Sequence, residues 1–185
     1  MRKIAALVLG ILGLFLWGCY SDDDYQFVQL RIQDSLSLEN EKNYVVGDTI
    51  FFELDFSRYL DEDGFSNKLD VFETTGALSF HYPMVLEKFS PQSNGYTQII
   101  VANNLIVEEK GMLIDDFNTL SALLNEEQDL YKSRMGIILA ETGNFRFFFD
   151  FFTLYPESNG DRIGLSITHN FTSINVEDFE FEVTQ

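Results

Sequence analysis

The sequence is poor in the residues that build disulfides, metal centres and long linkers. Its 185 residues include one cysteine, one tryptophan, three prolines and two histidines. A single cysteine cannot form an intrachain disulfide, and two histidines far apart in the sequence argue against a histidine-rich metal site. We find no Pro/Gly/Ser-rich linker, internal repeat or low-complexity segment, which favours a single folded domain.

Common catalytic motifs are missing as well. Thr168 stands where a Gly-x-Ser-x-Gly elbow would place its second glycine. There is no glycine-rich phosphate loop and no His-Glu-x-x-His pair. We therefore predict no catalytic residue and interpret His81 and His169 as hydrogen-bonded structural residues. A glycosidase-like carboxylate pair can always be chosen from so many acids, and only their separation in space would support one.

Basic residues are scarce relative to acidic ones. The chain has 12 lysines and arginines against 30 aspartates and glutamates, and residues 1–18 hold two of the basic residues and none of the acidic ones. The remainder therefore carries a formal charge of −20. Such a surface repels nucleic acid and anionic lipid heads. Solubility accounts for this charge, and affinity for divalent cations or basic partners is the sharper alternative.

The longest apolar run lies at the N-terminus, over residues 4–18, behind Arg2 and Lys3. A run of about fifteen residues is shorter than the ~20 residues that a membrane-spanning helix needs. Its length and basic start are typical of an export signal. We expect a cleaved signal helix over residues 1–18. The alternatives are a plain signal peptide with a chance cysteine and a single-pass anchor.

The residues that end this run resemble two known signals. Leu16-Trp17-Gly18-Cys19 is similar to a bacterial lipobox, which implies cleavage before Cys19 and acylation of that cysteine. More than one acyl chain gives stable membrane anchoring, and an acylated Cys19 leaves no free thiol. The following residues resemble the export signal of Bacteroidota surface lipoproteins, several of which bind or process glycans: Ser21, Asp22, Asp23 and Asp24. The resemblance implies an outer-membrane lipoprotein, facing the cell exterior, with residues 19–24 as a lipidated tether.

Residues 25–185 are predicted to form one all-β domain. Nineteen phenylalanines and eight tyrosines indicate a folded core. Many short segments alternate between apolar and polar residues, as Ile50, Phe52, Leu54 and Phe56 do within 49–57. The Gly47-Asp48 turn into this segment resembles an early strand of immunoglobulin-like domains on bacterial surfaces. We predict a single antiparallel β-sandwich with Greek-key connections and at most one short helix. An up-and-down barrel with a ligand cavity is the alternative.

Two segments carry the more specific structural predictions. Residues 131–140 and 145–155 are interpreted as strands joined by a hairpin at 141–144, and apolar residues on both faces of 145–155 favour a central strand. Residues 112–129 are ambiguous. The spacing of Phe117, Leu120 and Leu123 favours a short helix, whereas Asn125–Gln128 is equally suited to a hairpin turn. The other expected strands cover 25–33, 67–74, 77–86, 96–102, 105–109, 163–167 and 179–183.

Two groups of residues are candidates for binding. Asp61, Asp63 and Asp70 match positions three, five and twelve of a calcium loop, although a plain connection between strands is the favoured interpretation. Phe148 and Phe152 share one face of the expected strand 145–155. Residues 112–129 cover them in one interpretation. In the other they are exposed and bind sugar rings through their aromatic faces.

The sequence thus predicts a lipid-anchored, non-enzymatic surface protein that binds a glycan, a protein partner or another envelope component. No cofactor is expected apart from the calcium alternative. A surface hydrolase that acts on glycans through a carboxylate pair is the main competing hypothesis. An assembly protein without a ligand is the third. Ligand identity and oligomeric state stay open.

Overall fold

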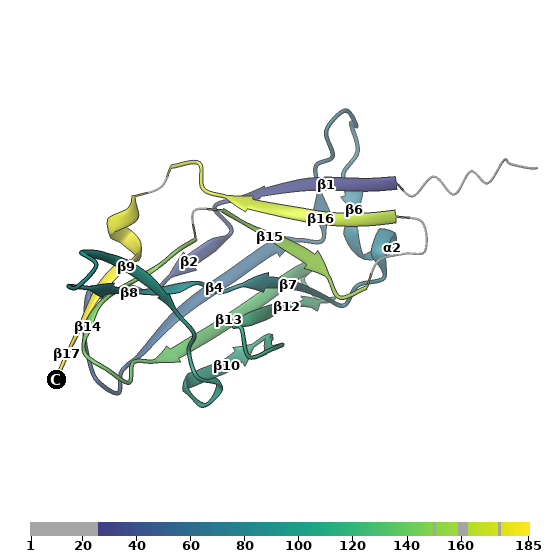
Figure 1. The fold of residues 1–185 in the computed structure, drawn as a ribbon. Helices are drawn as coiled ribbons and strands as arrows, with labels where there is room; N and C mark the ends of the chain where they lie inside the picture. The colour runs from purple at the N-terminus through teal and green to yellow at the C-terminus, as the bar shows by residue number, and fades with distance from the viewer. Residues whose placement is uncertain (1–25, 150, 159–162, 174) are drawn as a thin grey trace, which may run out of the picture.

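The computed structural model describes residues 26–149, 151–158, 163–173 and 175–185, and their regular secondary structure consists almost entirely of β-strands (Figure 1). Cys19 and the acidic residues that follow it lie outside this part of the chain. Ten strands form one large sheet. Two of them lie beside the main path, with β10 (Ile106–Lys110) on β13 and β11 (Met112–Leu113) on β12. The path itself runs in the order β1 (Gln26–Gln33), β16 (Ile163–Asn170), β15 (Phe151–Pro156), β7 (Ser79–Pro83), β12 (Thr119–Asn125), β13 (Leu130–Ile138), β4 (Thr49–Ser57) and β2 (Leu36–Leu38).

A two-stranded sheet, three short helical turns and a five-stranded sheet complete the fold. A two-stranded sheet pairs β5 (Tyr59–Leu60) with β6 (Leu69–Asp70). The helical turns are α2 (Val71–Thr75), η1 (Asn103–Leu105) and η2 (Val176–Phe179). No helix within the described ranges is long and apolar enough to cross a membrane. The second large sheet has five strands in the order β3 (Asn43–Val45), β17 (Glu180–Thr184), β14 (Gly143–Phe147), β8 (Leu86–Ser90) and β9 (Gly95–Ile99).

The large sheet curls until its two ends share one corner. β1 and β2 stand at opposite ends of the hydrogen-bonded path, yet only Asp34 and Ser35 separate them in sequence. The Asp34 N–H donates to the Asn170 carbonyl at 3.2 Å, and the Asp55 N–H donates to the Ser35 carbonyl at 2.9 Å. The predicted all-β class is therefore confirmed. The curled ten-stranded sheet does not establish a single two-layer sandwich.

The expectation of purely antiparallel pairing is wrong at two places. β1 runs parallel to β16, and β3 runs parallel to β17. Both exceptions are edge strands from the N-terminal part of the chain that add onto strands from its C-terminal part. Parallel neighbours need long connections, and nearly the whole described chain lies between the members of each pair. Local sequence patterns carry no information on such distant pairings.

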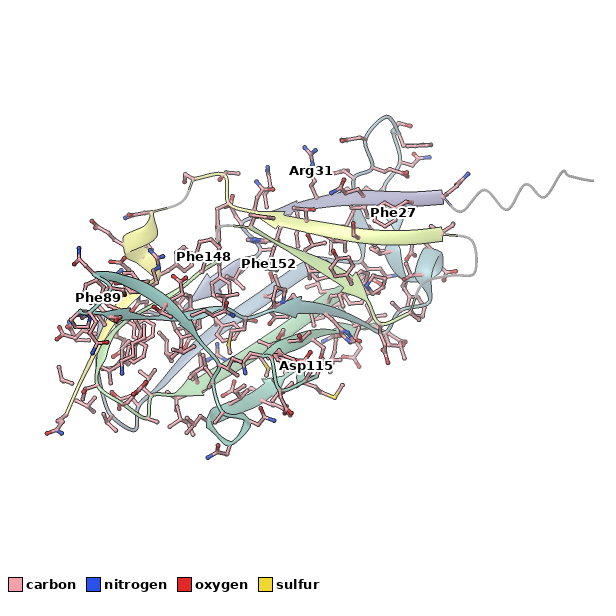
Figure 2. The ribbon with its side chains drawn as sticks, viewed as in Figure 1. Phe27, Arg31, Phe89, Asp115, Phe148 and Phe152 are labelled. Carbon is pink, nitrogen blue, oxygen red and sulfur yellow. The ribbon has the colours of Figure 1, made fainter. Side chains whose placement is uncertain are left out.

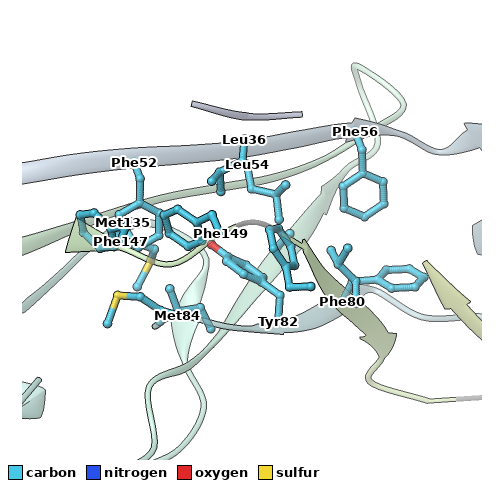
Figure 3. Close-up of a cluster of buried hydrophobic side chains, with 14 of the residues drawn as sticks. Leu36, Phe52, Leu54, Phe56, Phe80, Tyr82, Met84, Met135, Phe147 and Phe149 are labelled. Carbon is cyan, nitrogen blue, oxygen red and sulfur yellow. The ribbon is translucent and has the colours of Figure 1, made fainter. Parts of the chain in front are cut away.

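The core follows the alternation predicted from the sequence. Ile50, Phe52, Leu54 and Phe56 on β4 are all buried, as expected for one face of a strand. Figure 3 shows Phe52 and Leu54 together with aromatic and methionine side chains that other strands contribute to the same cluster. Tyr131 and Phe80 meet edge to face at 4.9 Å, one of many close ring contacts in this interior. The phenylalanine-rich composition is thus mainly a core.

Residues 145–155 do not form one continuous strand, and the hairpin predicted at 141–144 is wrong. β13 belongs to the ten-stranded sheet, whereas β14 pairs with β8 and β17 in the other sheet. The chain returns to the large sheet only at β15. Phe147 and Phe149 are buried before this crossing, but beyond it the buried positions are Phe152 and Leu154. The phase of burial therefore shifts by one residue where the chain changes sheets.

The helix favoured over residues 112–129 is also wrong, and the hairpin alternative is correct. Asn125 at the end of β12 lies opposite Leu130 at the start of β13. Ser121 and Ala122 are adjacent in sequence and both fully buried, because both faces of β12 are covered at this point. Because both faces of the strand are buried, its sequence lacks the alternation of apolar and polar residues that marks a half-buried strand. The spacing of the leucines then resembled that of a helix.

The short helix lies instead at α2, inside a segment that was predicted to be a strand. The Asp70 carboxylate accepts a hydrogen bond from the Glu73 N–H at 3.0 Å and caps the first turn. Gly76 ends the helix in the left-handed conformation, at φ 68°. The Asp-x-x-Glu spacing followed by a glycine is a recognised helix signal. The sequence therefore contained the information that placed this helix.

Candidate functional site

Three neighbouring strands of the large sheet present an exposed aromatic surface. Side chains alternate between the two faces of a strand, and the inward set on these strands, such as Leu30 and Leu154, is buried. The outward set includes Phe27, Phe151 and Tyr155, with exposures of 62%, 66% and 58%. We call the outward side of β1, β16 and β15 the aromatic face. Its members are Phe27, Gln29, Arg31, Gln33, Phe151, Thr153, Tyr155, Gly164, Ser166, Thr168 and Asn170.

The sheet register fixes how these side chains are arranged. Thr153 on β15 lies opposite Thr168 on β16, and Thr168 lies opposite Arg31 on β1. Thr153 also stands midway between Phe151 and Tyr155. With a rise of ~3.3 Å per residue, these two rings begin about 13 Å apart along the strand. The face therefore has aromatic rings separated by hydroxyl and guanidinium groups.

The aromatic face contains no carboxylate. The strands Gln26–Gln33, Phe151–Pro156 and Ile163–Asn170 include no aspartate or glutamate. Acidic residues nevertheless make up 30 of the 185 residues of the chain. Three adjacent strands are thus free of the charge that dominates the rest of the surface. This composition suits a neutral or anionic ligand with many hydroxyl groups.

A shallow hollow of about 370 Å³ adjoins the aromatic face at Tyr155. Tyr155 lies opposite His81 on β7, so the hollow continues the sheet surface onto the next strands. Its lining combines ring, hydroxyl and imidazole groups from β15, β7 and β12: His81, Tyr82, Pro83, Thr119, Thr153 and Tyr155. Clefts with apolar walls and a few polar groups are the usual form of small-ligand sites.

The inward side of β15 is held by a stack of rings. Phe152 is 5% exposed, and its ring stacks on that of His169 at 4.6 Å between centroids. The Phe171 ring meets the His169 ring edge to face, with 4.8 Å between the ring centroids. The Ser35 N–H donates to His169 Nε2 at 3.3 Å. The stack thus ties the aromatic face to the corner where the sheet closes.

His169 is the most unusual polar residue beneath the face. It is fully buried, and its Nδ1 has no hydrogen-bond partner among the described residues. Burial lowers its pKa to about 4, although the nearby Asp34 carboxylate acts in the opposite direction. The imidazole is therefore neutral at physiological pH. Because Nε2 accepts a hydrogen bond, the single proton of the neutral ring belongs on Nδ1.

The structure does not bring Phe148 and Phe152 together on an exposed face. Phe148 is 40% exposed and follows β14, where its N–H donates to the Val85 carbonyl at 2.9 Å. Phe152 lies in the core, and its ring packs against those of His169 and Tyr82. Figure 2 labels both side chains. Because burial changes phase at the crossing, the exposed rings on β15 are Phe151 and Tyr155, which sequence reasoning missed.

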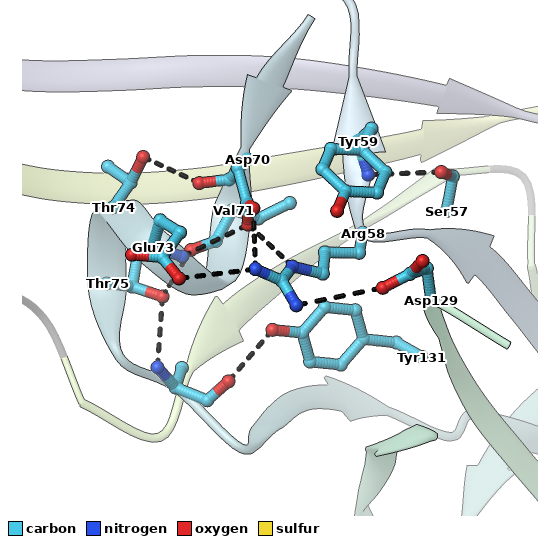
Figure 4. A network of polar contacts seen from close by, with 11 residues as sticks. Ser57, Arg58, Tyr59, Asp70, Val71, Glu73, Thr74, Thr75, Asp129 and Tyr131 are labelled. Atoms are coloured by element: carbon cyan, nitrogen blue, oxygen red, sulfur yellow. Dashed lines mark hydrogen bonds and ion pairs between the residues drawn. The ribbon is translucent and has the colours of Figure 1, made fainter. Parts of the chain in front are cut away.

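The three aspartates of the calcium-loop alternative have separate surroundings. Asp70 receives two hydrogen bonds from Arg58, at 2.7 and 2.6 Å, which together lower the pKa of its carboxyl (Figure 4). Asp61 and Asp63 instead border a hollow beside β1. Among the residues that the structure describes, no group of three histidine, cysteine or carboxylate side chains is arranged so that it could hold a metal ion. Arg58 also approaches Asp129 at 3.6 Å and so joins α2 to the β12–β13 turn.

A second concave surface lies on the five-stranded sheet, with a volume of about 660 Å³. Phe89 and Tyr96 line it together with several carboxylates, including Glu180. Arg146 lies over the Tyr96 ring at 4.3 Å and donates to Glu87 at 2.5 Å. One face of this ring is therefore already occupied. We refer to this surface as the acidic groove.

The comparisons with known proteins give two remote structural resemblances. No family model and no curated protein matches the chain. The ASH/PapD-like domain 7 of human CEP192 is 13% identical, with 77% of this chain and 87% of that chain covered, at a TM-score of 0.34. The pilus 2b backbone protein of group B streptococcus is 14% identical, with 74% and 56% covered, at a TM-score of 0.25. Similarity at this level supports no inference about function.

Proposed function

We propose that this protein is a lipid-anchored surface lipoprotein that binds a glycan through its aromatic face and does not catalyse a reaction. The observation that carries the proposal is the trio of exposed rings on three adjacent strands that contain no aspartate or glutamate, in a strongly acidic protein. In this proposal the domain has an immunoglobulin-like architecture and rigid strands display the rings. The anchor is Cys19, and the acidic residues after it direct the protein to the cell exterior.

Sugar rings have apolar C–H faces and a rim of hydroxyl groups. Flat, exposed aromatic rings such as Phe151 and Tyr155 fit the C–H faces. Side chains such as Thr153, Thr168 and Gln29 supply donors and acceptors for the hydroxyl groups. Hydroxyl and amide groups interrupt the rings, so the face is not a continuous apolar patch of the kind found at the centre of protein interfaces. This pattern favours a glycan over a protein partner.

The tether places the face close to the membrane. Only six residues separate Cys19 from Gln26 at the start of β1. Fully extended, this segment spans about 25 Å. Phe27, one residue further on, therefore lies within a short distance of the lipid anchor. Glycans at the outer-membrane surface are within reach of a domain held in this way.

The competing hydrolase hypothesis requires a carboxyl group whose pKa is raised. The shifts that the structure resolves for carboxyls have the opposite sign. Hydrogen bonds donated to the carboxylate lower the pKa in each case: Asp34, Glu39, Asp70 and Asp115. No observation on the described residues favours the hydrolase over the binding function.

Removing the exposed rings should weaken glycan binding without unfolding the protein. We expect Phe151→Ala and Tyr155→Ala each to reduce affinity roughly tenfold, because each removes a stacking surface worth about 1 kcal/mol or more. The measurement is a glycan array with the full chain in mild detergent, followed by calorimetry on the glycan that binds. Phe117→Ala is the matched control, since Phe117 is 74% exposed but lies off the aromatic face. Equal affinities for all three variants would exclude the face.

The anchor has a separate test. Cys19→Ala should abolish palmitate labelling, because in this proposal the acyl chains are attached to that cysteine. Labelling of expressing cells with radioactive palmitate provides the readout. A variant that is labelled as strongly as the parent chain would contradict the lipoprotein assignment.

A further inference from the structure

We infer that the glycan carries anionic groups, carboxylate or sulfate, and that Arg31 on the aromatic face binds them. This inference rests on the proposed function and names the class of its ligand. Arg31 is an exposed residue of β1. Figure 2 shows its side chain pointing away from the sheet.

Arg31 differs from the other described arginines in having no ion pair. Arg58 pairs with Asp70, Arg134 with Glu39, and Arg146 with Glu87. No carboxylate of the described residues forms an ion pair with Arg31. In a chain with 30 acidic and 12 basic residues, most cations find a partner within the fold. The guanidinium of Arg31 keeps its donors available.

The register places this guanidinium beside the rings. Arg31 lies opposite Thr168, which lies opposite Thr153. Two strand spacings of ~4.8 Å put the Arg31 backbone about 10 Å from the midpoint between Phe151 and Tyr155. An arginine side chain extends over several ångströms towards a neighbouring strand. A sugar stacked on either ring would therefore present its substituents to Arg31.

The surroundings of Arg31 suit a small oxyanion. The guanidinium donates in a fixed fork that matches carboxylate and sulfate oxygens. Gln29 and Gln33 flank it on the outward side of β1, and the Gln29 amide donates to Thr168 Oγ1 at 3.4 Å. These amides and hydroxyls can bind the remaining oxygens of the anion or adjacent sugar hydroxyls.

The net negative charge of the protein restricts which anions can bind at Arg31. A net charge of −18 repels anions in general. At physiological ionic strength, however, interactions between exposed charges fade over about 8 Å, and the three strands around Arg31 carry no carboxylate. Asp61 and Asp63 border a hollow of about 320 Å³ that Arg31 also lines. They limit the site to isolated anions rather than a dense polyanion.

Matched pairs of glycans test the inference. The full chain in mild detergent is titrated with an oligosaccharide that carries a single galacturonic acid and with its methyl ester, and with an oligosaccharide that carries a single sulfate and with its desulfated form. We expect at least one anionic member to bind tenfold or more tightly than its neutral partner, and the preference to weaken as salt is raised. Arg31→Gln should lower the affinity for the anionic member of that pair to the affinity for its neutral partner.

Lys110→Gln is the charge-matched control, because Lys110 on β10 is exposed and lies off the aromatic face. It should leave the anionic preference unchanged. Equal binding of both members of every pair, binding of neutral members alone, or no binding of any anionic member would overturn the inference. The proposed function would survive the first two results and fail only if no glycan binds. A preference that Arg31→Gln leaves intact, or that Arg31→Gln and Lys110→Gln reduce equally, would also overturn it.

Discussion

Lowering the pH from 6.5 to 4 should reduce the free energy of unfolding by about 3 kcal/mol through His169 alone. Burial lowers the pKa of this residue from its usual 6.5 to about 4 in the folded protein. Between these values the unfolded chain binds the proton and the folded chain does not. The stabilisation is therefore complete above pH 6.5 and is lost as the pH falls towards 4.

The geometry explains why protonation is unfavourable. Nε2 accepts the Ser35 N–H at 3.3 Å, and a protonated ring has no acceptor to offer. The ring is also fully buried against Phe152, so a charge there would lose its hydration. Ser35 belongs to the bend that joins the two ends of the curled sheet. Protonation should therefore loosen the closing corner first.

Urea unfolding followed by circular dichroism across this pH range would measure the effect. His169→Phe keeps an aromatic ring in the stack but removes the titrating group. The free energy of unfolding that this variant loses between pH 6.5 and 4 should therefore be smaller than the parent chain's loss by about 3 kcal/mol. His81→Asn is the control, because it also removes a histidine but leaves His169 in place, and it should keep the full loss. An NMR titration of the parent chain should give a midpoint near 4 for His169. A midpoint near 6.5, or the same acid-side loss in His169→Phe, would refute this account.

Phe149→Ala should destabilise the protein by about 3–5 kcal/mol, and Phe151→Ala by no more than about 0.5 kcal/mol. The two residues are identical and only two positions apart, but their exposures are 1% and 66%. Phe149 stacks on Phe147 at 5.2 Å and lies 5.8 Å from Phe52. It thus fills the space between the two sheets where the chain crosses from one to the other. Its removal would leave a cavity among rings that cannot all move inwards.

Denaturant unfolding of the two variants at neutral pH would test this prediction. A continuous strand over residues 145–155 would place both phenylalanines on one face, with similar costs for the two substitutions. The crossing seen in the structure predicts costs that differ several-fold. Comparable destabilisation by Phe149→Ala and Phe151→Ala would contradict the shift in burial.

Sequence reasoning succeeded where one face of a strand is buried and failed where the environment changes along the chain. β4 has a single buried face, so Ile50, Phe52, Leu54 and Phe56 revealed it directly. Residues 145–155 carry phenylalanines at odd and even positions because the chain leaves one sheet and enters another. The parts of this segment before and after the crossing are both rich in phenylalanine. Periodicity alone cannot separate them.

The prediction failed at α2 for a different reason. Asp70, Glu73 and Gly76 supplied a cap, its partner and a stop. The short length of the helix and its apolar neighbours gave the segment the appearance of a strand. A search for capping residues before a search for alternation would have found it.

The sequence could predict the type of candidate site but not the residues that form it. Sequence reasoning offered exposed aromatics for a sugar ligand as the alternative to a packed arrangement, and it named Phe148 and Phe152 rather than Phe151 and Tyr155. The absence of acids from each of the three strands can be read from the sequence. That these strands lie side by side cannot, because β1 and β16 come from opposite ends of the described chain. The aromatic face exists only through that pairing.

Hydrogen–deuterium exchange of the full chain, with and without the glycan that binds on the array, tests the central claim most directly. The account predicts that added glycan slows exchange in peptides covering residues 26–33, 151–158 and 163–170. The rest of the chain should exchange as before. Protection confined to residues 86–99 and 180–184, which cover the acidic groove, would show that the ligand binds on the other sheet and would contradict the account.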